Sequence, residues 1–188
     1  LYMGKAPDEI EFDCECRRLL KYIHTFDVLR SDKSISSHGL EPRTPFLDRT
    51  WTEYYLSIPA NIRFHTNNNQ CEKYLIRKAF SSEEYKNHNN ERLLPDDVLW
   101  RRKEAFSDGV SKHTRSLYEI IQEYADIEIE TTDDVTFTHL PPETNEQRYY
   151  RSIFEKHYDG LGKIIPHFWM PKYVNAKDSS ARTLSVYK

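Results

Sequence analysis

The feature that most limits the fold is the spacing of apolar residues over the first 23 positions. These side chains recur three or four residues apart, the period of one face of a helix: Phe12, Cys16, Leu19, Leu20 and Ile23. Pro7 and two acidic residues come just before, as is typical of a first helical turn. Val28 and Leu29 either continue this helix or begin a second one. Only five glycines occur in 188 residues, too few for a sheet-rich fold full of tight turns. The chain is therefore expected to be mainly α.

Further helices are expected along the rest of the chain. They are a short aromatic helix over 51–56, a helix over 72–80, a short one opened by 95–97, one with its apolar stripe over 117–124, and one over 144–158. The last begins with Thr144 and Gln147, spaced as a capping box. The polar stretches 61–69 and 126–138 are expected to be loops.

A loop bounded by two prolines follows the first helical region. Pro42 and Pro45 fix φ and push the residues before them toward extended backbone. Arg43 lies between these prolines, so its guanidinium is presented at low entropic cost and suits a fork-like contact with a carboxylate or phosphate. The sequence equally allows Arg43 to pair with Glu41 or Asp48 and pin the loop.

A stretch of unusual composition runs over 100–111 and reads W-R-R-K-E-A-F-S-D-G-V-S. A core helix would not carry four successive charges at 101–104, because burying unpaired charge is costly. We predict a basic turn that Trp100 and Phe106 hold against a core, with Lys103 available to an anion. The alternative is a connection between helices whose charges are solvated.

The stretch resembles a motif of the glutamine-hydrolysing asparagine synthetases, Trp-Arg-x-Lys-Glu-Ala-Phe-Ser-Asp-Gly. Residues 38–48, H-G-L-E-P-R-T-P-F-L-D, resemble the family's HGLExRVPFLD, and residues 180–184, S-A-R-T-L, resemble the end of the animal-type enzymes. The three blocks stand in the family's order, so the resemblance covers essentially the whole chain. Pro42 and Thr44 depart from the pattern, which usually has a small or aliphatic residue and Val there.

The resemblance implies a fold and a place in a longer protein. The family joins an N-terminal glutaminase domain to a synthetase domain of the α/β adenine-nucleotide α-hydrolase-like (ATP-pyrophosphatase) fold. The family's two nucleotide loops, Ser-Gly-Gly-x-Asp-Ser and Ser-Gly-x-Gly-Ser-Asp-Glu, do not occur in this sequence. Residues 1–188 are therefore expected to be the C-terminal, mainly helical part of the synthetase domain, with the parallel sheet lying mostly upstream.

The resemblance also implies a reaction and its residues. Aspartate would be converted to asparagine through β-aspartyl-AMP, at the expense of ATP and with ammonia from glutamine hydrolysis. Lys103 is carried over as the catalytic residue, a cation placed beforehand to stabilise phosphate charge. Arg30, Asp32, Glu41 and Arg43 are candidates for binding substrate or nucleotide. Mg2+ is expected with ATP, its ligands upstream and none in this chain. The glutaminase domain would be a partner in cis, and a homodimer stays open.

Charge, hydropathy and cysteine content exclude several classes. The net charge of −3 gives no general attraction to nucleic acid or to an anionic membrane. No apolar run approaches the roughly 18–20 residues of a membrane span, and no signal peptide is recognisable. The three cysteines, Cys14, Cys16 and Cys71, form neither a disulfide framework nor a zinc pattern. Free thiols in a reduced cytoplasmic protein are expected.

Two rival functions stay open. One is a helical interaction module in which positions 101–103 dock an acidic partner; it predicts that the chain folds alone and binds a macromolecule. The other is a related carboxylate-adenylating amidotransferase, such as a β-lactam synthetase. The asparagine synthetase interpretation predicts instead that the chain, prepared alone, exposes a large apolar face.

Overall fold

The structure is a computed structural model that describes residues 2–68, 70–81, 83–101, 103, 115, 117–130 and 136–176. The chain divides into two compact units, one made of Leu1–Lys103 with Pro171–Asn175 and the other of Glu104–Met170 with Ala176–Lys188. Within the described ranges the regular structure is helical, and extended pairing occurs as isolated bridges, such as the one between Lys86 and Arg92. The expectation of a mainly α chain is confirmed. No helix in these ranges is long and apolar enough to cross a membrane.

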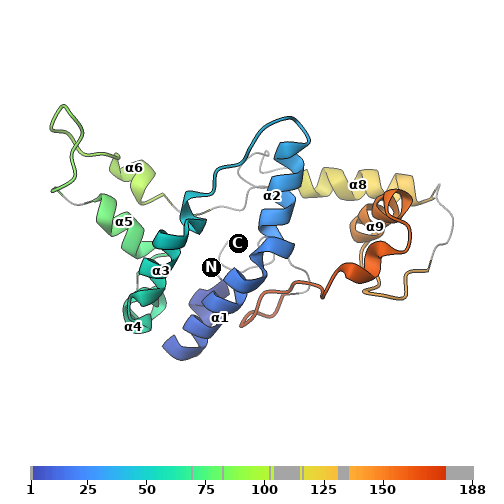
Figure 1. Cartoon of the computed structure of the whole chain (residues 1–188), viewed down its shortest axis with the longest axis horizontal. Helices are drawn as coiled ribbons and strands as arrows, with labels where there is room; N and C mark the ends of the chain where they lie inside the picture. The colour runs from blue at the N-terminus through green and yellow to red at the C-terminus, as the bar shows by residue number, and fades with distance from the viewer. Residues whose placement is uncertain are drawn as a thin grey trace. The chain divides into compact units, whose positions relative to one another are not determined.

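Two α-helices, α1 and α2, form the early part of the first unit (Figure 1). Helix α1, Glu9–Tyr22, begins where the Asp8 side chain accepts a hydrogen bond from the Glu11 backbone N–H at 2.8 Å. A single 3-10 turn, Ile23–Thr25, ends α1, and α2 follows over Asp27–Ser36. Of the two alternatives left by the sequence, the structure therefore has a second helix.

The remaining helices of the first unit are short. They are η1 Tyr2–Lys5, η3 Pro45–Leu47, α3 Arg49–Ser57, α4 Ala60–Arg63, η4 His65–Asn68, α5 Tyr74–Phe80 and α6 Asp96–Leu99. The loop predicted over 61–69 is wrong, because α4 and η4 occupy most of it. The reason is tertiary: Phe64 is 1% exposed and stacks on Phe12 of α1, with ring centroids 4.9 Å apart. Burial of this ring outweighs the polar composition around it.

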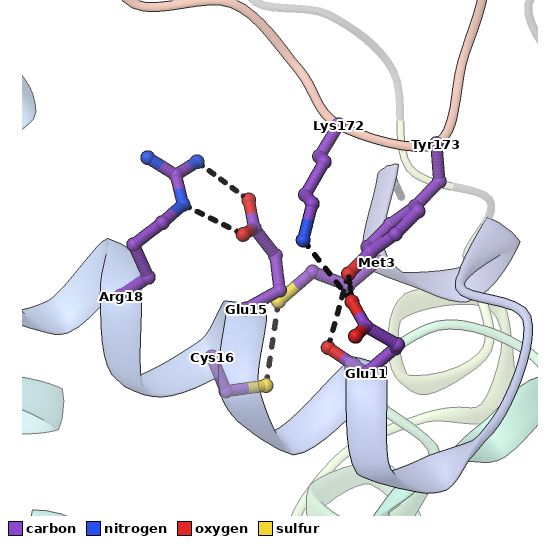
Figure 2. Close-up of polar contacts among 7 residues, drawn as sticks. All are labelled: Met3, Glu11, Glu15, Cys16, Arg18, Lys172 and Tyr173. Carbon is purple, nitrogen blue, oxygen red and sulfur yellow. Dashed lines mark hydrogen bonds and ion pairs between the residues drawn. The ribbon is translucent and has the colours of Figure 1, made fainter.

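The core of the first unit lies between α1 and the start of the chain. Ala6, Phe12, Cys16 and Phe64 are buried together, and Met3 and Tyr173 pack against them. Tyr173 reaches this core from the far end of the sequence. Figure 2 shows how the contact is made: the Tyr173 hydroxyl and the Lys172 ammonium both donate to Glu11 Oε2, at 2.6 and 3.1 Å. We call Glu11, Lys172 and Tyr173 the clasp.

The second unit is built around two helices that lie side by side, α8 over Leu117–Glu130 and α9 over Asn145–His157, followed by η5 over Leu161–Ile164. Ala125 of α8 is fully buried, and the rings of Tyr124 and Tyr149 meet edge to face at 5.7 Å. The loop predicted from residue 126 is wrong over 126–130, where α8 continues. Asp126 accepts a hydrogen bond from the Asn145 side chain at 2.8 Å, which fastens this end of α8 to α9.

The start of α9 follows the sequence closely. Thr144 is its N-cap and accepts from the Gln147 backbone N–H at 3.2 Å, as predicted. The Gln147 side chain accepts from the Glu143 N–H at 2.8 Å, one residue earlier than a capping box requires. Beyond α9, a Cβ added at Gly162 would collide with the Arg151 guanidinium, so a larger residue here would have to displace that side chain.

Candidate functional site

The candidate site begins at α5, whose N-cap residue has an unusual backbone. Lys73 has a φ of 61°, in the left-handed region, so the chain turns sharply before the helix. This turn lets Glu72, just outside α5, contact Arg77 inside it. Arg77 Nη2 donates to Glu72 Oε1 at 2.9 Å and Nε donates to the Glu72 carbonyl at 3.0 Å. The side chains are 12% and 18% exposed, so the pair is well shielded from water.

Arg77 also binds the backbone that leads to Lys103. Nη1 donates to the Leu99 carbonyl, and Nη2 donates to the Arg101 carbonyl at 2.9 Å. Lys103 in turn donates its backbone N–H to Glu72 Oε1 at 3.2 Å. We call this set of contacts the Arg77 anchor: the side chains of Glu72 and Arg77 with the backbone of Leu99, Arg101 and Lys103.

The anchor fixes main chain rather than a side chain. Hydrogen bonds to a charged partner contribute about 1.5–3 kcal/mol each, more than neutral ones. Leu99 is buried, and the Trp100 ring lies against Tyr74 of α5 with centroids 6.2 Å apart. Lys103 itself is half-buried. The backbone that leads to Lys103 is therefore held on both sides of Trp100.

The other predicted residues lie in local pairs. Arg43 donates with both Nη atoms to Glu41, at 3.0 and 3.1 Å, and the side chains are 80% and 73% exposed. Asp48, the alternative partner, instead caps α3 by accepting from the Trp51 N–H at 3.0 Å. An ion pair this exposed contributes little stability. Arg43 can therefore exchange Glu41 for a ligand at small cost, and its binding role stays a prediction.

Two more predicted residues lie on α2. Arg30 pairs with Asp27 at 2.7 Å, and Asp32 lies 3.8 Å from the Lys33 ammonium. Within the described residues, no hydrogen bond or ion pair joins Arg30 or Asp32 to the proline-bounded loop. Of the four candidate binding residues, the structure thus brings only Glu41 and Arg43 into contact. Roles in binding stay predictions for all four.

Comparison with known proteins decides the family. Residues 4–183 match the family model described as asparagine synthase. The chain belongs to the asparagine synthase family. Relatives named asparagine synthetase [glutamine-hydrolyzing] are 46% identical in Gallus gallus, 44% in Cricetulus griseus and 41% in Homo sapiens. Each comparison covers all of this chain and 32% of the relative, so the chain spans about a third of their length. No solved structure matches the chain.

Membership of the asparagine synthase family confirms the resemblance read from the three motifs. The stretch over 100–111 is only partly visible: Arg102 and residues 104–114, with Phe106 among them, lie outside the described residues. The Trp100 ring lies against Tyr74, but its side chain is 38% exposed, so this contact is made at the surface and the predicted brace against a core stays a prediction. The block at 180–184 also lies outside the described residues.

Sequence reasoning did not find the Arg77 anchor. Lys73 and Arg77 stand four positions apart, a spacing that on one helical face is usually solvated, and the sequence assigns neither residue a role. That pairing does not apply, because Lys73 is the left-handed cap of α5 rather than part of its first turn. Arg77 reaches carbonyls 22 and 24 residues away, and no local pattern signals such a contact.

The described residues offer no ready metal site. No group of three or more His, Cys, Asp or Glu side chains among them is arranged to hold an ion.

Proposed function

We propose that this chain is the C-terminal part of the synthetase domain of a glutamine-dependent asparagine synthetase. The observation that carries the proposal is identity of 41–46% to named asparagine synthetases over the whole chain. The parent domain would have the α/β ATP-pyrophosphatase fold, to which this chain contributes helices. A glutaminase domain in cis would supply ammonia, and the protein would work in the cytosol.

The reaction has two steps. A side-chain carboxylate oxygen of aspartate attacks the α-phosphorus of ATP, and the bond to the bridging oxygen breaks to release pyrophosphate. Ammonia then attacks the β-carbonyl carbon of β-aspartyl-AMP, loses a proton to solvent, and displaces AMP to leave asparagine. Both leaving groups gain negative charge as they depart, so a cation held nearby lowers both barriers.

Lys103 is the residue proposed to supply that cation. Its half-burial supports the role, since a charge partly shielded from water interacts more strongly with phosphate. The bond from its backbone N–H to Glu72 supports it too, because a fixed main chain limits where the ammonium can go. Arg43 and Glu41 in the proline-bounded loop, and Arg30 and Asp32 on α2, are proposed to bind substrate or order the loop.

ATP is a substrate of the proposed reaction. Mg2+ is expected to bind with ATP through residues upstream of this chain, and the described residues contain no cluster suited to the ion.

The test is aspartate-dependent release of pyrophosphate by the full-length protein, with asparagine identified as the product. Lys103→Met should raise the activation free energy by roughly 2–4 kcal/mol, which is about a 30- to 900-fold loss of rate. Lys78→Met, at an exposed position of α5, is the matched control and should keep the wild-type rate.

The outcomes separate the rival functions. Pyrophosphate release that needs a different carboxylic acid would favour a related adenylating amidotransferase. No release with any acid, together with tight binding of an acidic macromolecule, would favour the interaction module. Equal rates for Lys103→Met and wild type would rule out the role given to Lys103.

A further inference from the structure

We propose that Arg77 and Glu72 are positioning residues that set where Lys103 meets the phosphate in the pyrophosphate-forming step. Neither side chain need touch the nucleotide; both act through the backbone that carries Lys103. The inference rests on the proposed function of Lys103 and extends it to two residues that the motifs do not include.

Arg77 is suited to this work because its donors diverge from a rigid plane. One guanidinium reaches the carbonyls of Leu99 and Arg101, which lie on either side of Trp100. A lysine at this position would offer a single nitrogen on a flexible stem and could not span both carbonyls with the same geometry. Because Arg77 projects from α5, the position of that helix is passed on to the 99–101 segment.

Glu72 links Arg77 to the backbone of Lys103. Its Oε1 atom accepts from Arg77 Nη2 at 2.9 Å and from the Lys103 N–H at 3.2 Å. One oxygen thus joins the guanidinium to the backbone of Lys103. Loss of Arg77 would free the Glu72 carboxylate and, with it, the backbone of Lys103.

The consequence for rate follows from the length of the lysine side chain. A four-carbon stem on a loose backbone lets the ammonium explore several ångströms, whereas phosphate charge must be met at a fixed point in the transition state. A misplacement of about 1 Å in a catalytic group can cost about 100-fold in rate. Binding of ATP in the ground state depends less on the exact position of the Lys103 ammonium, so KM for ATP should change less than kcat.

The first experiment measures pyrophosphate release by the full-length protein carrying Arg77→Met. We expect kcat to fall by about 10- to 100-fold and KM for ATP to change by less than about threefold. The same substitution in a Lys103→Met background should lower the remaining rate by less than about twofold, because Arg77 acts only through Lys103. A residue that merely supports the fold would cost the same factor in both backgrounds.

The second experiment does not depend on activity. Amide hydrogen exchange over residues 99–103 should be at least about tenfold faster in Arg77→Met and in Glu72→Ala than in wild type. Lys78→Met, on the same helix but exposed, should leave that exchange unchanged.

Equal losses of kcat in the wild-type and Lys103→Met backgrounds would overturn the inference, as would unchanged exchange over 99–103. Should Arg77→Met fail to fold, Arg77→Lys and Glu72→Gln keep a donor or acceptor in place and should show the same pattern in milder form. A wild-type protein that releases no pyrophosphate with aspartate would overturn the proposed function; the exchange measurement would still decide whether the anchor holds the backbone.

Discussion

Arg63 has the most deeply buried charged side chain among the described residues, at 1% exposed. Its Nε donates to the Ile58 carbonyl at 2.8 Å, and Nη2 pairs with Asp13 of α1. The guanidinium also lies over the ring of Tyr55, 5.3 Å from its centroid. Nη1 is buried without a hydrogen-bond partner in the described part of the chain. Because arginine cannot shed its proton, Asp13 is the group that compensates this buried charge.

We therefore expect Asp13→Asn to destabilise the packing of α4 on α1 by about 2–4 kcal/mol, since it leaves a buried cation without its counter-ion. Asp27→Asn is the matched control. Its partner Arg30 is 80% exposed, so the loss should stay below about 0.5 kcal/mol. Amide exchange, converted to local opening free energies, measures the effect of Asp13→Asn along α1 and that of Asp27→Asn along α2; similar losses for the two variants would contradict the assignment.

Cys16 differs from the other two cysteines in its surroundings. All three are free, but Cys16 is buried whereas Cys14 and Cys71 are exposed. Burial raises the pKa of the Cys16 thiol to about 11, and its Sγ lies 3.3 Å from Met3 Sδ (Figure 2).

At pH 8 the thiolate fraction of Cys16 should be roughly 200-fold lower than that of an ordinary cysteine. We expect iodoacetamide to modify Cys14 and Cys71 in the folded protein and to spare Cys16 over the same time, with all three reacting in urea. Peptide mass spectrometry gives the readout. Modification of Cys16 as fast as of Cys14, two residues away, would show that this face of α1 is open.

Among the elements, the segment after residue 170 is expected to respond to pH through its contact with Glu11. The hydrogen bond from Tyr173, with a second from Lys172, holds the pKa of Glu11 below its ordinary value of 4.5. A carboxyl group with a depressed pKa stabilises the folded state above its ordinary pKa, and that contribution is lost as pH falls through the lower value. Burial, followed by the bond to Glu11, raises the pKa of Tyr173 above 10, so the hydroxyl keeps its proton at neutral pH.

The clasp should accordingly stay closed from about pH 5 to pH 9 and open in acid. An NMR titration of the Glu11 carboxyl measures this directly. Tyr173→Phe should move the midpoint up toward the ordinary value, whereas Tyr85→Phe, at an exposed tyrosine elsewhere, should not move it. If Tyr173→Phe leaves the titration midpoint of Glu11 unchanged, another group is responsible for the lowered pKa of Glu11.

The elements also show what local sequence can and cannot predict. Asp8 and Thr144 mark the starts of α1 and α9 because a cap is a contact between residues three apart. The loop predicted over 61–69 was wrong because Phe64 stacks on Phe12, which lies 52 positions away along the chain. Arg77 was missed as an anchor for the same reason. Motif resemblance pointed to Lys103, but what holds its backbone became visible only in three dimensions.

At the scale of the whole molecule, the first unit leaves a row of aromatic side chains exposed. Phe46, Trp51 and Tyr54 are 62%, 36% and 63% exposed, with successive ring centroids 5.8 and 6.4 Å apart. Contiguous apolar surface of this kind promotes association in water.

We expect the 188-residue chain, prepared alone, to bind the dye ANS and to scatter light at micromolar concentration. Replacing both Phe46 and Tyr54 by Ser should reduce dye binding at least about twofold. Tyr85→Ser, which removes an exposed ring outside the row, is the control. If the chain stays monomeric and does not bind ANS, the result would instead support the interaction module that folds on its own.

The clasp also has a consequence for the order of events on the ribosome. Glu11 and Tyr173 are 162 residues apart, and every residue of Glu104–Met170 is translated between them. Helix α1 therefore leaves the exit tunnel long before its last partner exists, while α8 and α9 emerge together and can pair at once. Within this chain the earlier segment must wait for the later one, so a pause in translation ahead of Tyr173 would leave helix α1 without its contact to the clasp.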